Sequence, residues 1–348
     1  MTERSAAPGT SGTYRGVIAI AGMFIVLAVL FIMSFTVGRY SMSLSEMWNG
    51  LTNNYDVGDE AYNSMIIMVN VRLPRILGAI LVGGALSMSG AAFQGVFGNP
   101  LVSPDLLGTS SGAGFGACVA ILSGMLAFGI QLVALIGGIA ATLITVFIAR
   151  ALMHKRSGLI AYVLVGMVIS ALFEAGISIA KYISDPYSDL ETITYWLLGS
   201  LRGVTIEQLG ISLVPASIGF LILLWGGYKV NLLSFSDEEA LSMGLNVRTF
   251  RIIILFGATM LCASSVATAG IVGWIGLVVP HIARILVGSD NNKMFITSFL
   301  TGAAFLLLID NIARSILYFE IPISILTGVI GAPVFIVLLL KGGNVGWR

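Results

Sequence analysis

Charged residues are scarce in this chain of 348 residues, since Asp, Glu, Lys and Arg together make up only 10% of it. A soluble domain carries about 25% charged residues, which it needs to cover its surface. Hydrophobic residues reach 57% and the mean hydropathy is +0.97, so the composition excludes an ordinary soluble fold. The formal net charge of +1 gives no reason to expect a nucleic-acid partner.

Cysteine and histidine are also scarce, with two residues of each. Cys118 and Cys262 lie inside apolar segments, where we expect small buried side chains and neither a disulfide framework nor a metal site. Residues 108–112 match the G-x-S-x-G pattern of hydrolases, but only His154 and His281 could act as a base and no third group is apparent. We therefore expect no catalytic residues, no metal and no cofactor.

A phosphate-binding loop of the form G-x-x-x-x-G-K-[ST] is missing as well. Such a loop cradles the phosphates of ATP with its backbone N–H groups. If this protein works with ATP, the ATPase must therefore be a separate chain.

Long apolar runs are abundant, and a run of about 20 residues is enough to cross a hydrocarbon core about 30 Å thick. We predict an all-α, polytopic membrane bundle of about ten transmembrane helices. The eighth candidate is short for a straight crossing. The candidate spans are 16–37, 76–97, 106–128, 130–149, 159–180, 209–226, 252–270, 271–283, 295–313 and 323–340.

Lys and Arg gather on one side of the membrane if these spans alternate in direction and the N-terminus lies inside. Of 18 such residues, only six then fall outside: Arg39, Arg72, Arg75, Lys181, Arg202 and Arg314. The positive-inside rule places both termini in the cytoplasm, with residues 1–15 as a polar tail. The longest polar stretch, 38–70, is too short for a domain of its own, so residues 1–348 form a single transmembrane domain.

The second span carries a small residue at every fourth position. Small side chains on one face let a neighbouring helix approach closely, which drives helix association in lipid. We predict a tightly packed central helix, although the pattern could also be incidental in a chain with 42 glycines. The residues are Ala79, Gly83, Ser87, Ala91 and Gly95.

Arg72 and Arg75 flank Pro74 immediately before the second span, and Arg314 follows the ninth. Proline suits the first turn of a helix, and residues three apart share one helix face. These three outer cations could form a docking patch for an acidic partner, or they could contact lipid headgroups and the acidic outer loops.

Residues 231–251 form the longest polar stretch on the predicted inner side. The serines are followed by acids, which resembles an N-cap with a negative first turn, and Gly244 could end the short helix. We interpret the stretch as a helix that couples the bundle to a cytosolic protein, with a plain connecting loop as the alternative. The candidate coupling residues are Ser234, Asp237, Glu238, Glu239, Ala240, Leu241, Met243, Gly244 and Leu245.

Glu174 lies within the fifth apolar span. An ionisable group at membrane depth is costly and is a functional candidate by default. We predict that Glu174 faces a water-filled pathway, while a protonated residue near a helix end is the alternative.

Three blocks of sequence occur in order and resemble the permease family of the iron-siderophore, haem and vitamin B12 ABC importers. The first comprises VRLPR at 71–75, SGAAFQ at 89–94, NPL at 99–101 and PDLLG at 104–108. The second is WIGLVVPHIAR at 274–284, and the third comprises DNIAR at 310–314, IPIS at 321–324 and GAPVF at 331–335. The resemblance extends over about residues 16–341.

This resemblance implies a permease that forms a homodimer in the cytoplasmic (inner) membrane, with the pathway along the dimer axis. It also implies two cytosolic ATPase subunits and an extracytoplasmic substrate-binding protein. In the family, arginines at the positions of Arg72, Arg75 and Arg314 meet acidic residues of that binding protein, and the short inner helix docks on the ATPase. The Pro280-His281 pair matches a structural turn, so His281 is not expected to bind a metal.

The cargo that the resemblance implies is a metal chelate, with an iron-siderophore first and cobalamin or haem next. The same architecture could instead carry molybdate or tungstate. A different class, an ion-coupled secondary transporter, would need no ATPase, but Glu174 alone gives it little support.

Overall fold

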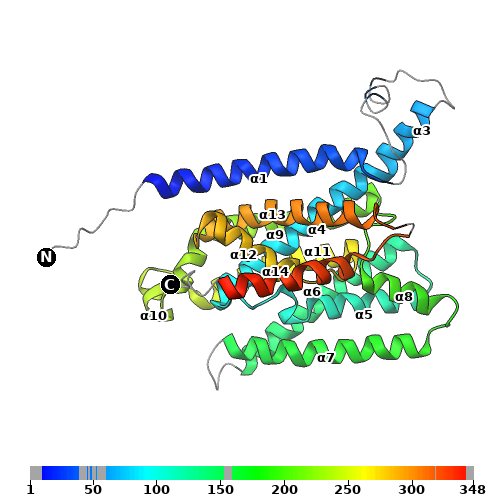
Figure 1. Ribbon diagram of the computed structural model, residues 1–348. Coiled ribbons are helices and arrows are strands. Elements are labelled where there is room, and N and C mark those ends of the chain that lie inside the picture. The colour runs from blue at the N-terminus through cyan, green and yellow to red at the C-terminus, as the bar shows by residue number, and fades with distance from the viewer. Residues whose placement is uncertain are drawn as a thin grey trace.

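The computed structural model describes residues 10–38, 60–152, 159–317 and 319–341, together with Ser45, Trp48 and Thr52. These residues form a bundle of helices and include no strand. Most helices run roughly parallel or antiparallel to one another (Figure 1). The first half contains α1 (Thr10–Thr36), α3 (Glu60–Ile67), the π-helix η1 (Met68–Arg72), α4 (Leu73–Phe97), the 3₁₀ helix η2 (Pro104–Leu107), α5 (Thr109–Leu122) and α6 (Ala127–Leu152).

The second half continues the bundle with helices of more varied length. It contains α7 (Leu159–Ile183), α8 (Asp189–Leu198), α9 (Ile206–Asn231), the 3₁₀ helix η3 (Leu232–Ser234), α10 (Asp237–Ser242), α11 (Val247–Ala269), α12 (Ile275–Val287), α13 (Asn291–Ala313) and α14 (Ile323–Lys341). The short helix α10 lies at the same end of the bundle as the start of α1 and the end of α14 (Figure 1). The helices α3 and α8 lie at the opposite end (Figure 1). We refer to these as the inner and the outer end, following the orientation predicted from Lys and Arg.

Seven stretches of helix are long and apolar enough to cross a membrane, and three apolar helices are shorter. The long ones are Gly16–Thr36, Tyr62–Phe97, Ala127–Leu152, Leu159–Ile183, Ile206–Ser234, Val247–Ala269 and Asn291–Ala313. The shorter ones are Thr109–Leu122, Ile275–Val287 and Ile323–Leu338. The ten predicted spans thus correspond to seven candidate spans and three helices that are short for a straight crossing.

Helix α4 runs through the middle of the bundle, where it contacts α9, α11, α12 and α13. Of the residues in the most apolar stretch of its span, 83% are buried, against 6% in α1. A Cβ atom on Gly83 would lie 2.3 Å from the carbonyl oxygen of Gly302 on α13. A Cβ on Gly90 would lie 1.8 Å from the carbonyl oxygen of Gly276 on α12. Only glycine permits these approaches, which explains how four helices fit around α4.

The predicted packing residues lie along this central helix. Ala79, Ser87 and Ala91 are fully buried, and a Cβ on Gly95 would lie 2.8 Å from Val230 on α9. The small residues that recur at every fourth position of α4 therefore face α9 as well as α13.

The second span is longer than predicted, because helix continues from α3 through η1 into α4. The π-helical turn ends at Arg72, two residues before Pro74. Since proline has no N–H group, it cannot donate the usual hydrogen bond to the carbonyl oxygen four residues earlier. The π turn lies where this hydrogen bond is missing, and Arg72 is its last residue.

The prediction of a span at 106–128 was wrong in its bounds. Helix α5 has only 14 residues, and η2 precedes it with Gly108 between them at a φ of +82°. A helix of that length extends about 21 Å, which is less than the hydrocarbon core. The apolar character of the flanking residues concealed both ends of the helix.

The eighth span was also misplaced, because α12 begins at Ile275 and ends at Val287. Gly270 and Trp274 both have positive φ values, of +72° and +70°, so the chain cannot pass from α11 into α12 as one helix. The prediction of a turn at Pro280-His281 was wrong, because both residues lie within α12. His281 is placed by a 3.1 Å contact between its Nε2 atom and the carbonyl oxygen of Pro100.

Candidate functional site

The three arginines predicted for docking lie together near the outer end, and we call them the arginine cluster. Arg72, Arg75 and Arg314 are only 4%, 8% and 6% exposed. Arg72 and Arg314 border the same residue, since a Cβ on Gly38 would lie within 3.8 Å of both side chains. The cluster is therefore enclosed by the ends of α1, η1 and α13, although the sequence suggested an open patch.

Two carboxylates hold the cluster, and sequence reasoning missed both of them as partners. Arg75 donates from Nε to both carboxylate oxygens of Asp310, at 2.9 and 3.1 Å, and its Nη2 lies 2.9 Å from Oδ1. Arg75 also donates from Nη1 to Oε1 of Glu320 at 2.9 Å. Asp310 and Arg314 lie four residues apart in the segment DNIAR, but Glu320 lies in an apolar connection that carries no such signal.

Arg314 adopts its position through backbone and side-chain acceptors at the end of α1 and α13. Its Nη2 donates to the carbonyl oxygen of Ser34 at 2.6 Å and to the side chain of Asn311. Its Nε lies 3.6 Å from Oδ2 of Asp310. Burial lowers the pKa of Arg314 to about 10, although the charge of Asp310 opposes this shift. Arg72 donates from Nη1 to the carbonyl oxygen of Phe35, so two of the arginines bind the end of α1.

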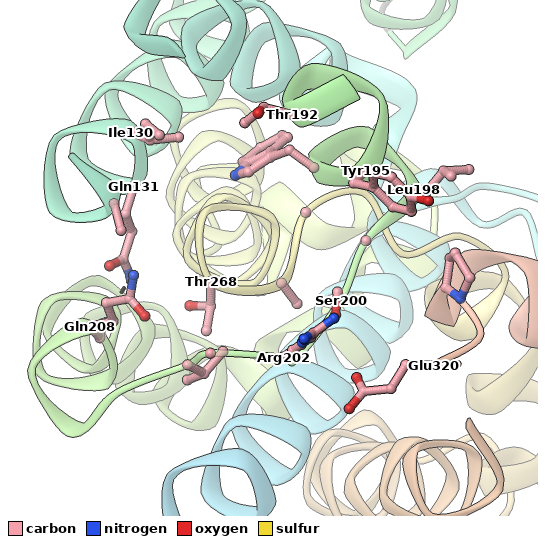
Figure 2. Close-up of a pocket in the computed structure, with 18 of the residues that line it drawn as sticks. Ile130, Gln131, Thr192, Tyr195, Leu198, Ser200, Arg202, Gln208, Thr268 and Glu320 are labelled. Carbon is pink, nitrogen blue, oxygen red and sulfur yellow. Dashed lines mark hydrogen bonds between the residues drawn. The ribbon is translucent and has the colours of Figure 1, made fainter. Parts of the chain in front are cut away.

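A pocket of about 1060 Å³ opens beside this cluster, and we call it the outer pocket (Figure 2). It is formed by the outer ends of α6, α8, α9 and α11 and by the connections at 199–204 and 319–322. Glu320 lies at its edge and thus belongs both to the pocket and to the arginine cluster. Its other polar side chains include Gln131, Glu191, Arg202, Gln208 and Thr268.

Polar side chains link the helices that form the wall of the outer pocket. Gln131 on α6 donates from Nε2 to the carbonyl oxygen of Gln208 and to Ser212 on α9, both at 2.8 Å. Thr268 on α11 donates to Ser212 at 2.6 Å. The connection after α8 is fixed by backbone bonds from Ser200 to Ala269 and from Ile323 to Gly199.

At the inner end, α10 is defined by its caps. Ser236 is the N-cap and forms a capping box, since its Oγ accepts from the N–H of Glu239 and Glu239 accepts from the N–H of Ser236. These hydrogen bonds lower the pKa of Glu239. Gly244 follows the helix with a φ of +85°, a conformation that favours glycine. Ser234, which the sequence suggested as part of the cap, is the last residue of η3.

The predicted coupling residues divide into an anchoring set and an exposed set. Ala240 and Leu245 are buried against the bundle, while Leu241 and Met243 are exposed, as is Phe235 just before the helix. The acids Asp237, Glu238 and Glu239 lie in the first turn, and Asp237 forms a bidentate ion pair with Arg251 of α11. The helix is thus fixed to the bundle by one face and presents apolar side chains on the other.

Glu174 lies on the exposed side of α7, near the middle of that helix. It is separate from the arginine cluster and from α10, because α7 contacts α5, α6 and η2. The structure brings it together with none of the other predicted site residues.

Asp105 in η2 is an acid that sequence reasoning did not single out. Its carboxylate accepts a hydrogen bond from Ser110. The side chain opens onto a cavity of about 170 Å³ that Trp274 and Leu277 also line. The acid after Pro104 was visible in the sequence, but nothing there indicated that it would line a cavity.

The described residues contain no group of three or more His, Cys, Asp or Glu side chains that could hold a metal ion. Cys118 and Cys262 are both buried free thiols. In the described residues, an all-helical bundle with seven helices long and apolar enough to cross a membrane defines the class of polytopic membrane proteins.

The comparisons with known proteins identify the family within that class. The model of the FecCD transport family matches residues 26–341, which is most of the chain. The molybdate import permease MolB of Haemophilus influenzae is 38% identical over 320 residues, or 92% of this chain and 94% of its own length. The hemin permease HmuU of Yersinia pestis is 35% identical, again over 92% and 94%. The chain belongs to the FecCD transport family and is the permease subunit of an ABC transporter.

Two further relatives widen the range of cargo within the family. The vitamin B12 permease BtuC of Salmonella paratyphi A is 38% identical over 79% of this chain and 83% of its own length. A solved metal-chelate type ABC transporter in an inward-facing conformation matches with a TM-score of 0.84 and 36% identity, covering 92% of this chain and 98% of its own. These relatives are permeases and not enzymes, and the fold of this chain is that of an ABC permease.

Proposed function

We propose that this chain is the membrane subunit of a binding-protein-dependent importer that moves a metal chelate into the cytoplasm. The observation that carries the proposal is the arrangement of one rigid bundle with the arginine cluster near one end and the exposed face of α10 at the other. An importer of this kind needs a surface for a substrate-binding protein outside and a surface for an ATPase inside. The family assignment supports the same arrangement.

The partners follow from this assignment. We propose a homodimer in the cytoplasmic membrane, two ATPase subunits at the inner end and one extracytoplasmic binding protein at the outer end. ATP binding closes the ATPase dimer, and α10 would transmit that motion to a bundle with two states. The translocation path would run between the two copies, where Glu174 on the exposed side of α7 could contact water.

The cargo we favour is an iron-siderophore, followed by cobalamin or haem. The outer pocket has a volume of about 1060 Å³, at the upper end of the range for drug-sized ligands. Its ionisable side chains include Arg202 but also Glu191 and Glu320, so it offers little net attraction to an oxyanion. Molybdate is the alternative cargo, because MolB is a molybdate permease with 38% identity to this chain.

Uptake by a reconstituted system tests the function. The chain would be placed in liposomes with candidate ATPase and substrate-binding proteins of its own organism, and iron-siderophores, cobalamin, haem and molybdate would be added one at a time. We expect accumulation of a chelate that depends on ATP and on the binding protein. Uptake that persists without both partners would instead indicate an ion-coupled transporter that uses Glu174.

A further inference from the structure

The resemblance to the family already implies that acidic residues of the binding protein meet the arginine cluster. We propose that Glu320 holds a carboxylate-binding site of this cluster in the free permease, and that docking of the binding protein displaces Glu320 from it. The inference rests on the proposed function, because it assumes that a binding protein meets this end of the bundle. It explains how three buried arginines, already paired within the chain, can still serve a partner.

The two carboxylates of the cluster are held in different ways. Asp310 is fully buried and receives three contacts from Arg75, between 2.9 and 3.1 Å. Glu320 receives a single contact of 2.9 Å, from Nη1 of Arg75, and its side chain is 21% exposed. A bidentate pair is stronger than a single contact and fixes geometry more firmly. Asp310 is therefore the structural partner of Arg75, and Glu320 is the one that can be exchanged.

The contact of Glu320 with the cluster is also incomplete. Its Oε2 atom is buried without a hydrogen-bond partner, and so is Nε of Arg314, which lies 3.6 Å from the nearest oxygen of Asp310. An unmade hydrogen bond to a buried charged group is costly. A carboxylate that reaches both guanidinium groups would satisfy more donors than Glu320 does.

The charges of the site favour an incoming anion. Three guanidinium groups and the carboxylates of Asp310 and Glu320 leave the cluster with a formal charge of +1. If Glu320 moves away, the charge becomes +2, and an acidic side chain of the partner would restore it to +1. The partner would thus replace one carboxylate with another and leave no buried charge unpaired.

The outer pocket gives access to this site. Glu320 lines the pocket together with Phe319, Ile321 and Pro322, and Figure 2 shows its carboxylate at the pocket's edge. Ile316, Leu317 and Phe319 are exposed in the same connection between α13 and α14. Exposed apolar side chains beside a charged contact suit a protein surface better than a hydrated free ion.

Binding of the purified permease–ATPase complex to the substrate-binding protein that supports uptake in liposomes tests the proposal. Glu320→Gln removes the competing charge while keeping the size of the side chain. We expect this variant to bind about three- to tenfold more tightly, mainly through faster association, with a steeper dependence on salt. The matched control is Glu191→Gln, which removes a carboxylate from the same pocket that forms no ion pair in the described part of the chain. We expect this control to bind like the wild type.

Thermal unfolding of each complex shows whether the variants fold. If Glu320→Gln does not assemble, Glu320→Asp carries the test, because its shorter side chain weakens the contact to Arg75 and should also tighten docking. Unchanged or weaker docking by a folded Glu320 variant would mean that this carboxylate has a structural role only. Glu320→Gln could instead strengthen the binding of molybdate to the complex and leave docking unchanged. That result would assign the site to a free oxyanion and overturn the proposal. A wild-type complex that binds no binding protein would overturn the proposed function itself.

Discussion

The two ends of this bundle present their charged residues in opposite ways. At the outer end, the arginine cluster is at most 8% exposed and its partners come from residues far apart in the sequence. At the inner end, α10 is exposed, and its capping box and its ion pair join residues at most 14 positions apart. The outer site is therefore part of the fold, whereas the inner site is a local structure added to it.

This difference has an energetic consequence. Removing one member of a buried ion pair leaves an unpaired charge, which costs several kcal/mol, while an exposed pair contributes little. Substitutions at the outer end should thus lower the stability of the whole protein, whereas substitutions at the inner end should lower it by about 1 kcal/mol at most.

The largest expected effect is a difference in stability between variants of two aspartates, one at each end of the bundle. Asp310→Asn removes the bidentate partner of Arg75 and should destabilise the protein by about 3–5 kcal/mol. Asp237→Asn breaks the exposed pair with Arg251 and should cost less than about 1 kcal/mol. Thermal unfolding of the two variants in one detergent gives the comparison. Equal shifts of the melting temperature in the two variants would show that the two ends do not differ in stability in this way.

A functional effect without loss of stability is expected at α10. Leu241→Asp places a charge on the exposed apolar face that we propose for the ATPase, and it should lower ATP-dependent uptake at least tenfold. Leu126→Asp is the control, because Leu126 is also exposed but lies in the connection between α5 and α6. Co-purification of the ATPase measures the effect directly. Normal ATPase binding by Leu241→Asp would exclude this face as the contact.

A smaller effect is expected from the cap of α10. Ser236→Ala removes the N-cap side chain, which costs about 1 kcal/mol in helix stability. Hydrogen exchange of residues 237–243 should become faster, whereas exchange in α4 should not change. Protection in α4 that falls in parallel would show that α10 is not an independent local structure.

The same cap should depend on pH. The pKa of Glu239 is lowered from 4.5 in the folded protein by its bonds to Ser236. A lowered pKa adds stability above the unfolded value, and this stability is lost as the pH falls through the folded value. Protection of α10, corrected for intrinsic exchange rates, should therefore decrease below about pH 4.5. In Ser236→Ala this decrease should be smaller, and an equal decrease would assign it to another group.

The smallest and most specific effect is expected between the two ends, at Glu174. Glu174→Gln should leave folding and both docking interactions unchanged, because the residue is exposed on α7. If it contacts the pathway, uptake should fall by about two- to fivefold through the lost charge. Unchanged uptake of every cargo tested would exclude a role for Glu174.

The sequence predicted more about the inner end than about the outer end. Serine followed by acids and a glycine indicates a short capped helix, because capping bonds join residues three positions apart. The partners of Arg75 lie 235 and 245 positions away, and no local pattern can indicate such a pairing. Short helices such as α5 and α8 were missed or misplaced for a similar reason, since apolar or polar flanking residues hide their ends.

Composition and hydrophobic runs by themselves determined that this protein is an all-helical membrane bundle, since water and lipid select residues by polarity alone. The small residues of α4 determined which helix could lie at the centre. Only the tertiary structure decided that Arg72, Arg75 and Arg314 would be enclosed and that Asp310 and Glu320 would share them. The physical reason is that burial and long-range ion pairing depend on how α1, α4, α13 and the connection to α14 meet in space.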